Sequence, residues 1–96
     1  KPVRYDLYIA SMGTEAEEKA FLLANNLRKL GSKVEIDHIG RSVKAQLKYA
    51  DKIGASYVLV LGGDELEKGE AKLKRMSDGK ETITALNAES IHKLMV

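Results

Sequence analysis

The stretch Tyr57-Val58-Leu59-Val60-Leu61-Gly62-Gly63 (YVLVLGG) decides the fold of this chain. It is apolar without interruption until the pair of glycines, which is typical of a β-strand covered on both of its faces. A strand of this kind lies in the middle of a sheet. The rest of the chain must therefore supply neighbouring strands and the helices that cover both faces.

Before this strand, the sequence predicts a strand, a helix, a second strand and a second helix. Residues 5–10 (YDLYIA) are apolar and aromatic enough for another inner strand, and residues 34–36 alternate like a half-buried strand. Between them, Thr14 and Glu17 have the spacing of a capping box, and Gly31 is placed to end a helix in a left-handed conformation. The expected buried stripe of this helix consists of Ala20, Leu23, Ala24, Leu27 and Leu30.

The second helix is expected over residues 43–53, with Ser42 as its N-cap and Gly54 as its stop. Its expected buried stripe consists of Val43, Leu47, Ala50 and Ile53. Together with residues 57–61, the chain then contains two strand–helix–strand units. Such units join parallel strands by right-handed crossovers, so we expect the first three strands to be parallel.

After the central strand, residues 64–68 leave room for about one helical turn. Residues 70–76 and 80–85 predict two strands, which a turn at residues 77–79 joins into an antiparallel hairpin. Asn87 is expected to cap a last helix. The residues of this helix that are expected to point inward are Ile91, Leu94 and Met95. The elements predict a three-layer α/β sandwich with a mixed five-stranded sheet and three helices.

Length and composition bound the class of protein. The 96 residues suffice for one domain with a single core, and the chain is 44% hydrophobic and 31% charged. No apolar run approaches the ~20 residues of a membrane span, so we expect a soluble protein. The absence of cysteine fits a reducing compartment, and the expected location is the cytoplasm. Residues 1–4 are typical of a linker remnant, so residues 5–96 are expected to be one domain of a longer protein. The chain has no cysteine, which excludes disulfides, thiolate metal sites and cysteine nucleophiles.

The residue patterns of common active sites are missing from the sequence. The loop at residues 11–13 lacks the glycine spacing of a dinucleotide-binding fold, and Gly62-Gly63 is not followed by the Lys-Ser/Thr pair of a phosphate loop. His38 and His92 have no partner at a metal-ligand spacing. We therefore expect neither catalytic residues nor a metal site in this chain.

Basic residues cluster in the second predicted helix. The net charge is only +2, so any nucleic-acid surface must come from the way charges are grouped. Arg41 stands at the mouth of the helix, and Lys44, Lys48 and Lys52 form a row along it at i, i+4 spacing. From this row alone, a solvated face and a functional face are equally well supported.

A second basic group lies in the strand predicted at residues 70–76. Lys72 and Lys74 alternate with apolar residues, so both leave the same face of the sheet. The loop at residues 62–69 is expected near the C-terminal end of the second helix, where both basic groups would border it. Basic side chains neutralise phosphates, and a carboxylate such as that of Glu65 can accept from the N–H groups of an unpaired guanine. The pattern favours single-stranded RNA as the ligand.

Two stretches resemble a known family: GRSVKAQLKYADKIGA at residues 40–55 and YVLVLGGDELEKGEAKLKRMSDG at residues 57–79. With the first half of the chain, they resemble the C-terminal anticodon-binding domain of bacterial-type histidyl-tRNA synthetase. The resemblance covers nearly the whole chain and identifies residues 5–96 as that domain. It implies the strand order 2-1-3-4-5 with the fourth strand antiparallel, a fold found in the class II synthetases for histidine, glycine, threonine and proline.

The resemblance also implies which residues meet the anticodon. In the wider family, a glutamate in the loop after the central strand and basic residues in the next strand and the preceding helix contact anticodon bases. The matching positions here are Glu65, Lys74 and Lys48. Some relatives have arginine at the two basic positions, and lysine lacks the bidentate fork of arginine, so we expect phosphate contact there rather than base reading. The further residues assigned to RNA binding, from their charge and position, are Arg41, Lys44 and Lys72.

This resemblance predicts a non-catalytic module that binds the anticodon stem-loop of histidine tRNA. A separate catalytic domain of the parent enzyme, expected to be a homodimer, would use ATP and magnesium to aminoacylate the tRNA end. No cofactor is expected in this domain itself. Two alternatives stay open: a regulatory paralogue that binds proteins through its first and third helices, and a small flavodoxin-like enzyme or nucleotide binder.

Overall fold

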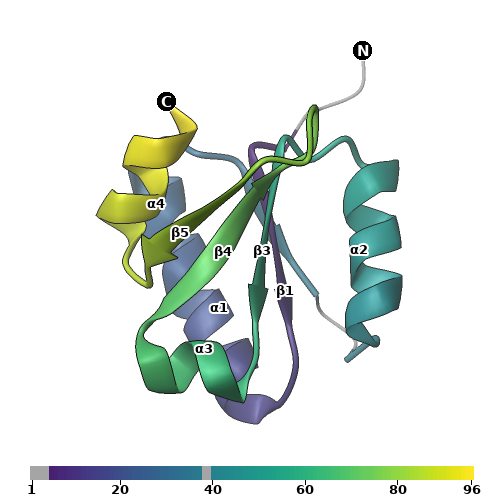
Figure 1. Ribbon diagram of the computed structural model, residues 1–96, viewed down its shortest axis with the longest axis vertical. Helices are drawn as coiled ribbons and strands as arrows, with labels where there is room; N and C mark the ends of the chain where they lie inside the picture. Colours follow the sequence, from purple (N-terminus) through teal and green to yellow (C-terminus); the bar gives the residue numbers. More distant parts are fainter. Residues whose placement is uncertain (1–4, 38–39) are drawn as a thin grey trace.

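The computed structural model describes residues 5–37 and 40–96, so the expected linker at residues 1–4 and His38 lie outside the described residues. The strands are β1 (Leu7–Ser11), β2 (Val34–Ile36), β3 (Tyr57–Leu61), β4 (Glu70–Arg75) and β5 (Glu81–Ala85). The helices are α1 (Thr14–Lys29), α2 (Val43–Lys52), α3 (Gly63–Lys68) and α4 (Ala88–Met95). The sheet order is β2-β1-β3-β4-β5 (Figure 1), which confirms the predicted mixed five-stranded sheet.

The apolar strand β3 lies at the centre of the sheet, as its sequence predicts. Leu59 of β3 pairs with Ile9 of the parallel strand β1 on one side and with Leu73 of the antiparallel strand β4 on the other. Because side chains alternate along a strand, Leu59 enters the core on one face and Val58 enters the core on the other. Both faces of β3 are therefore buried, which explains its uninterrupted apolar sequence.

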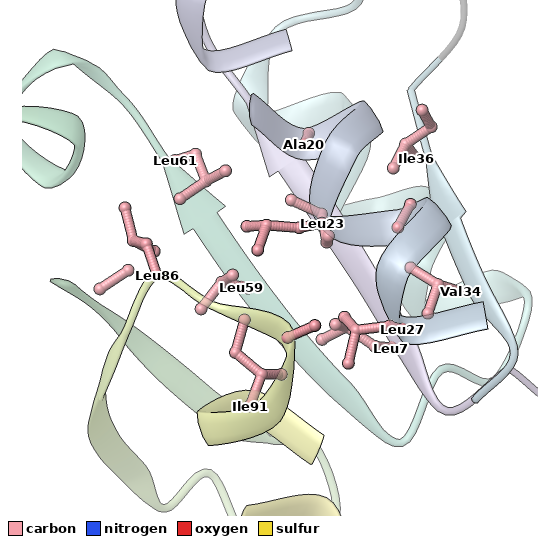
Figure 2. Packing of buried hydrophobic residues seen from close by; sticks show 14 of the residues in the cluster. Leu7, Ala20, Leu23, Leu27, Val34, Ile36, Leu59, Leu61, Leu86 and Ile91 are labelled. Atoms are coloured by element: carbon pink, nitrogen blue, oxygen red, sulfur yellow. The ribbon is translucent and has the colours of Figure 1, made fainter. Parts of the chain in front are cut away.

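The two faces of the sheet carry different numbers of helices. Helices α1 and α4 cover one face, and α2 stands alone on the other (Figure 1). Figure 2 shows the larger core, in which Leu23 and Leu27 of α1 pack with Leu59 of β3 and Ile91 of α4. The smaller core under α2 consists of Tyr8, Ala10, Ala50, Ala55 and Val58. Helix α2 packs on β1 and β3, so its side of β4 and β5 has no helix over it.

The predicted ends of the helices are mostly confirmed. The Ser42 hydroxyl accepts a hydrogen bond from the backbone N–H of Ala45 at 3.2 Å, and Asn87 caps α4 in the same way. Gly31 and Gly54 follow α1 and α2 with φ of 97° and 71°, which is the left-handed region that glycine tolerates. Each of these helices thus has the stop that its sequence predicts.

The predicted capping box of α1 is wrong. Gly13 is the N-cap residue, Thr14 is already helical, and no side chain caps this end. The physical reason is the backbone of Gly13, whose φ of 96° turns the chain sharply after β1 and moves the helix start one residue back. The short turn predicted at residues 64–68 is the six-residue helix α3, so the described residues form four helices rather than the predicted three.

Some residues of the predicted buried stripes are exposed. Leu30 and Leu94 lie at the ends of their helices and are exposed. In α2 the buried residues are Gln46 and Ala50, while Leu47 is 37% exposed. The reason is that α2 packs on only part of the sheet, so its buried stripe is narrow and Leu47 lies on its flank.

Candidate functional site

The uncovered half of the sheet, together with α2 and α3, forms a groove of about 420 Å³. Its aliphatic side chains come from α2, β3, the residue after β4, and β5: Leu47, Val58, Val60, Met76 and Ile83. Its charged side chains come from α3, β4 and β5: Glu65, Lys68, Glu70, Lys72, Lys74 and Glu81. The groove is therefore an aliphatic surface bordered by lysines and carboxylates.

The alternation of β4 places two of the predicted site residues in this groove. Ala71 and Leu73 are buried in the larger core, so Lys72 and Lys74 leave the opposite face, as predicted. Lys74 pairs across the strands with Glu81, and the Lys72 ammonium lies 4.0 Å from a Glu81 carboxylate oxygen. Both partners of this ion pair are exposed, so it leaves the lysines accessible.

Glu65 lies in the same groove and is held by the backbone. Its Oε1 accepts a hydrogen bond from the N–H of Gly62 at 2.8 Å, which fixes the carboxylate at the start of α3. A Cβ added to Gly62 would lie 3.1 Å from this oxygen, so glycine is the residue that leaves room for the carboxylate. Among the described residues, Oε2 of Glu65 makes no hydrogen bond or ion pair. Glu65 thus presents one oxygen in a fixed position to a ligand in the groove.

The lysine row of α2 lies outside the groove. Lys44 and Lys48 are exposed, and Lys48 is two residues, or about 200° around the helix, from both Gln46 and Ala50 on the buried face. Leu47 is the residue of α2 that lines the groove. The row therefore follows the crest of the groove wall and points away from the sheet.

The expected position of the residue 62–69 loop relative to α2 is wrong. Gln46 in the first half of α2 contacts Ser11 at the end of β1, and Ser11 pairs with Leu61 immediately before that loop. The loop thus lies near the N-terminal end of α2 rather than the C-terminal end. The reason is the crossover geometry, in which the helix runs antiparallel to the strands that it joins.

Arg41 is engaged within the fold. Its Nε donates to Oδ1 of Asp37 at 2.9 Å, and its backbone N–H donates to Oδ2 at 2.8 Å. Its guanidinium carbon lies 4.5 Å from the ring centroid of Tyr49, a cation–π contact. Burial raises the pKa of the Asp37 carboxyl, but the hydrogen bonds from Arg41 outweigh it and hold the pKa below its ordinary value. The contribution of Arg41 to RNA binding stays a prediction.

Sequence reasoning missed Gln46, a polar residue of α2 whose side chain is completely buried (0% exposed). Its Oε1 accepts from the Ser11 N–H at 2.9 Å, and its Nε2 donates to the Ser11 carbonyl at 2.9 Å and the Arg41 carbonyl at 2.6 Å. The available signal was the helical period, because Gln46 lies one turn before the buried Ala50. The apolar stripe predicted from the sequence contains Leu47 in its place, because a stripe defined by apolar residues alone passes over a glutamine.

The carboxyl ends of β1 and β3 form the point where open α/β sheets of this strand order bind nucleotides. Here Gln46 occupies the Ser11 N–H and Glu65 occupies the Gly62 N–H, so these backbone donors are not open to a phosphate. This geometry disfavours the alternative of a nucleotide binder. Over the part of the chain that the structure describes, no three His, Cys, Asp or Glu residues are grouped to hold a metal ion. No helix in that part is long and apolar enough to cross a membrane.

Comparison with known proteins gives consistent results. A histidine–tRNA ligase of Clostridium perfringens is 54% identical over 91 residues, which are 95% of this chain and 22% of that protein. A histidine–tRNA ligase of Caldanaerobacter subterraneus is 54% identical over 85% of this chain and 20% of that protein. The crystal structure of apo S. aureus histidyl-tRNA synthetase superposes with a TM-score of 0.87 and 36% identity, covering 93% of this chain and 26% of that one.

This chain thus spans about a fifth of the length of the curated relatives it matches. The family model described as "Anticodon binding domain" matches residues 6–94, which is nearly the whole chain. The chain therefore belongs to the anticodon-binding domain family, and its sheet order is the one expected for that family.

Proposed function

We propose that this chain is the C-terminal anticodon-binding domain of a histidine–tRNA ligase and that it binds the anticodon stem-loop of histidine tRNA in the groove. The observation that carries the proposal is the meeting of Glu65, Lys72 and Lys74 in one groove, although they come from two different elements. Two relatives that are 54% identical to this chain are histidine–tRNA ligases, which supports histidine tRNA as the partner.

Each part of the groove has a chemical role in this proposal. Lys72 and Lys74 neutralise phosphates of the anticodon loop, and Lys44 and Lys48 extend the positive charge along the crest of α2. Oε2 of Glu65 accepts from the N–H groups on the Watson–Crick edge of a guanine. The aliphatic side chains provide an apolar surface for an unstacked base.

The remaining steps of aminoacylation belong to other parts of the parent enzyme. We propose that a separate catalytic domain binds ATP and magnesium, and that this domain contributes binding energy and orientation. A homodimeric parent enzyme and a cytoplasmic location stay predictions.

Filter binding of histidine tRNA across a range of salt concentrations tests the groove. We expect Lys74→Ala to weaken binding about fivefold at low salt and to reduce the salt slope by about one, because one phosphate contact is lost. Lys93→Ala is the matched control, since this exposed lysine lies on α4 over the opposite face of the sheet. Equal effects of the two variants would contradict a groove-specific contact.

Glu65→Gln tests base reading without removing the cap of α3. The amide oxygen can still accept from the Gly62 N–H, while an NH₂ group replaces the free oxygen that faces the ligand. We expect the variant to lose discrimination between histidine tRNA and an anticodon-swapped tRNA, whereas Lys48→Ala weakens both tRNAs alike. Unchanged discrimination in Glu65→Gln would reject Glu65 as the reader.

One observation favours the alternative of a protein-interaction domain. Phe21 and Leu22 are adjacent on α1 and are 55% and 57% exposed. An exposed apolar pair on a helix is suited to protein contact. The same binding experiment decides between the two functions, because a domain that serves only protein interaction binds no tRNA.

A further inference from the structure

Three residues hold Arg41 through four contacts. Asp37, which follows β2, binds its backbone N–H and its Nε. Gln46 of α2 binds its carbonyl, and the ring of Tyr49 lies under its guanidinium. The side chain of Asp37 is 2% exposed and Gln46 is 0% exposed, whereas the side chain of Arg41 is 31% exposed. This arrangement is a buried polar network with one basic residue at its centre.

The network joins the start of α2 to two strands of the sheet. Through Gln46, α2 is tied to the end of β1 at Ser11, and through Asp37 the segment before α2 is tied to the end of β2. Tyr49 continues the contact inward, with its ring centroid 6.0 Å from that of the buried Tyr8. The position of α2 on the sheet therefore depends on hydrogen bonds with strict geometry as well as on aliphatic packing.

Stability alone is a weak reason for such a network. A buried ion pair recovers the cost of desolvation only with good geometry, and apolar residues in its place often give equal stability. A buried network in which every polar group is hydrogen-bonded fixes the groups that it joins in a single arrangement. The groups joined here are the start of α2 and the sheet. Helix α2 carries Leu47, which lines the groove, and the exposed Lys44 and Lys48, which lie outside it.

We propose that Asp37, Gln46 and Arg41 are positioning residues for tRNA binding, an inference that rests on the proposed function of the groove. They hold the α2 wall and its lysine row at one distance from Glu65, Lys72 and Lys74, so that the RNA meets a preorganised surface. Arg41 acts by holding α2 in place through its contacts with Asp37 and Tyr49, and its guanidinium does not contact an RNA phosphate.

The substitution Asp37→Asn separates positioning from charge. It removes a negative charge near the RNA surface, so electrostatics alone predicts tighter tRNA binding. It also breaks the ion pair with Arg41, so positioning predicts weaker binding, which we expect to be about fivefold by filter binding of histidine tRNA. Asp51→Asn is the matched control, because it removes the same charge from the exposed face of α2 without touching the network, and we expect it to bind about twofold tighter.

Arg41→Lys is the second variant. Lysine keeps the charge but cannot make the stacked and bonded contacts of the guanidinium. We expect it to weaken binding as much as Arg41→Gln does, whereas a phosphate contact would be largely kept by lysine. Ile91→Val, a buried change in α4 on the opposite face, controls for general destabilisation, since it lowers the melting temperature without changing tRNA affinity.

The outcomes separate the two proposals. All binding is measured at a temperature where circular dichroism shows each variant folded. Tighter binding by Asp37→Asn, or full retention of affinity by Arg41→Lys, would overturn the positioning roles while leaving the groove intact. Absence of tRNA binding by the unmodified chain, or no effect of Lys74→Ala, would overturn the proposed function itself.

Discussion

The two faces of the sheet use the same strands for different purposes. The face under α1 and α4 is closed by a large aliphatic core, shown in Figure 2. The face under α2 is closed only over β1 and β3, and the remainder is the groove with its lysines. The strands β4 and β5 belong to both, with buried residues on one side and charged residues on the other. The comparison indicates that most of the buried apolar surface lies on one face, while the uncovered half of the other face is the surface proposed for ligand binding.

The largest difference between the faces should appear in unfolding experiments. Leu59 is fully buried in the larger core, and we expect Leu59→Ala to lower the free energy of unfolding by about 2–5 kcal/mol. Ile83 lies in the groove and is 62% exposed. We expect Ile83→Ala to change the free energy of unfolding by less than about 0.5 kcal/mol. Urea unfolding followed by circular dichroism measures both. Similar losses for the two variants would mean that side chains in the uncovered half of the sheet stabilise the fold as much as the larger core does.

The sequence was sufficient for the face with the larger core. The elements there follow from single-chain patterns: the apolar run of β3, the helical stripe of α1 and the alternation of β4. The strand order did not follow from these patterns and came from the family resemblance, because periodicity does not say which strands are neighbours. The start of α1 was misplaced because the turn depends on the φ of Gly13, which a capping pattern does not reveal.

The smaller core should show a distinct dependence on alkaline pH. Burial, with a smaller contribution from Asp37, raises the pKa of Tyr8 from 10.0 to about 12; Glu35 and Tyr49 also raise it and Arg41 lowers it. Between these values the unfolded chain releases the Tyr8 proton and the folded chain keeps it, so the free energy of unfolding falls as pH rises. The loss begins near pH 10 and reaches about 2–3 kcal/mol near pH 12.

Tyr8→Phe should remove this dependence. Its hydroxyl has no hydrogen-bond partner within residues 5–37 and 40–96, so the variant should cost little at neutral pH. Urea unfolding at a series of pH values compares it with the unmodified chain and with Tyr5→Phe, a change in a residue at the margin of the same core. An identical alkaline loss in Tyr8→Phe would place its origin elsewhere.

Gly62→Ala should affect the groove and leave the fold largely intact. Its φ of −136° suits alanine, but the new Cβ would lie 3.1 Å from Oε1 of Glu65. We expect the carboxylate to move and its bond to the Gly62 N–H to weaken, with a change in stability below about 1 kcal/mol. Anticodon discrimination should fall as it does in Glu65→Gln. Retained discrimination, measured by filter binding with swapped tRNA, would show that the fixed position of the carboxylate is not needed.

The groove could be predicted in part, and the reason lies in the kind of contact. Strand alternation predicts that Lys72 and Lys74 leave the same face of the sheet, and the structure brings both into one groove with Glu65. Their role in RNA binding stays a prediction. Arg41 and Gln46 owe their environment to Asp37 and Ser11, which lie in other elements. A basic residue in or just before a helix looks the same in sequence whether it faces solvent or a buried carboxylate, so pattern alone could not separate Arg41 from Lys44 and Lys48.

The smallest expected effect on stability concerns Glu81, which places a negative charge in the groove beside the two lysines of β4. Its ion pair with Lys72 joins exposed groups at 4.0 Å, so Glu81→Gln should change the free energy of unfolding by less than about 0.5 kcal/mol. The same change frees positive charge for the RNA, and we expect tRNA binding about twofold tighter, with Glu89→Gln on α4 as the control. Glu81 and Glu89 are both exposed, so we expect the binding assay to distinguish these variants more clearly than the unfolding assay. Equal affinities would mean that the RNA does not reach β5, and the ligand surface would then be confined to β4, α3 and the crest of α2.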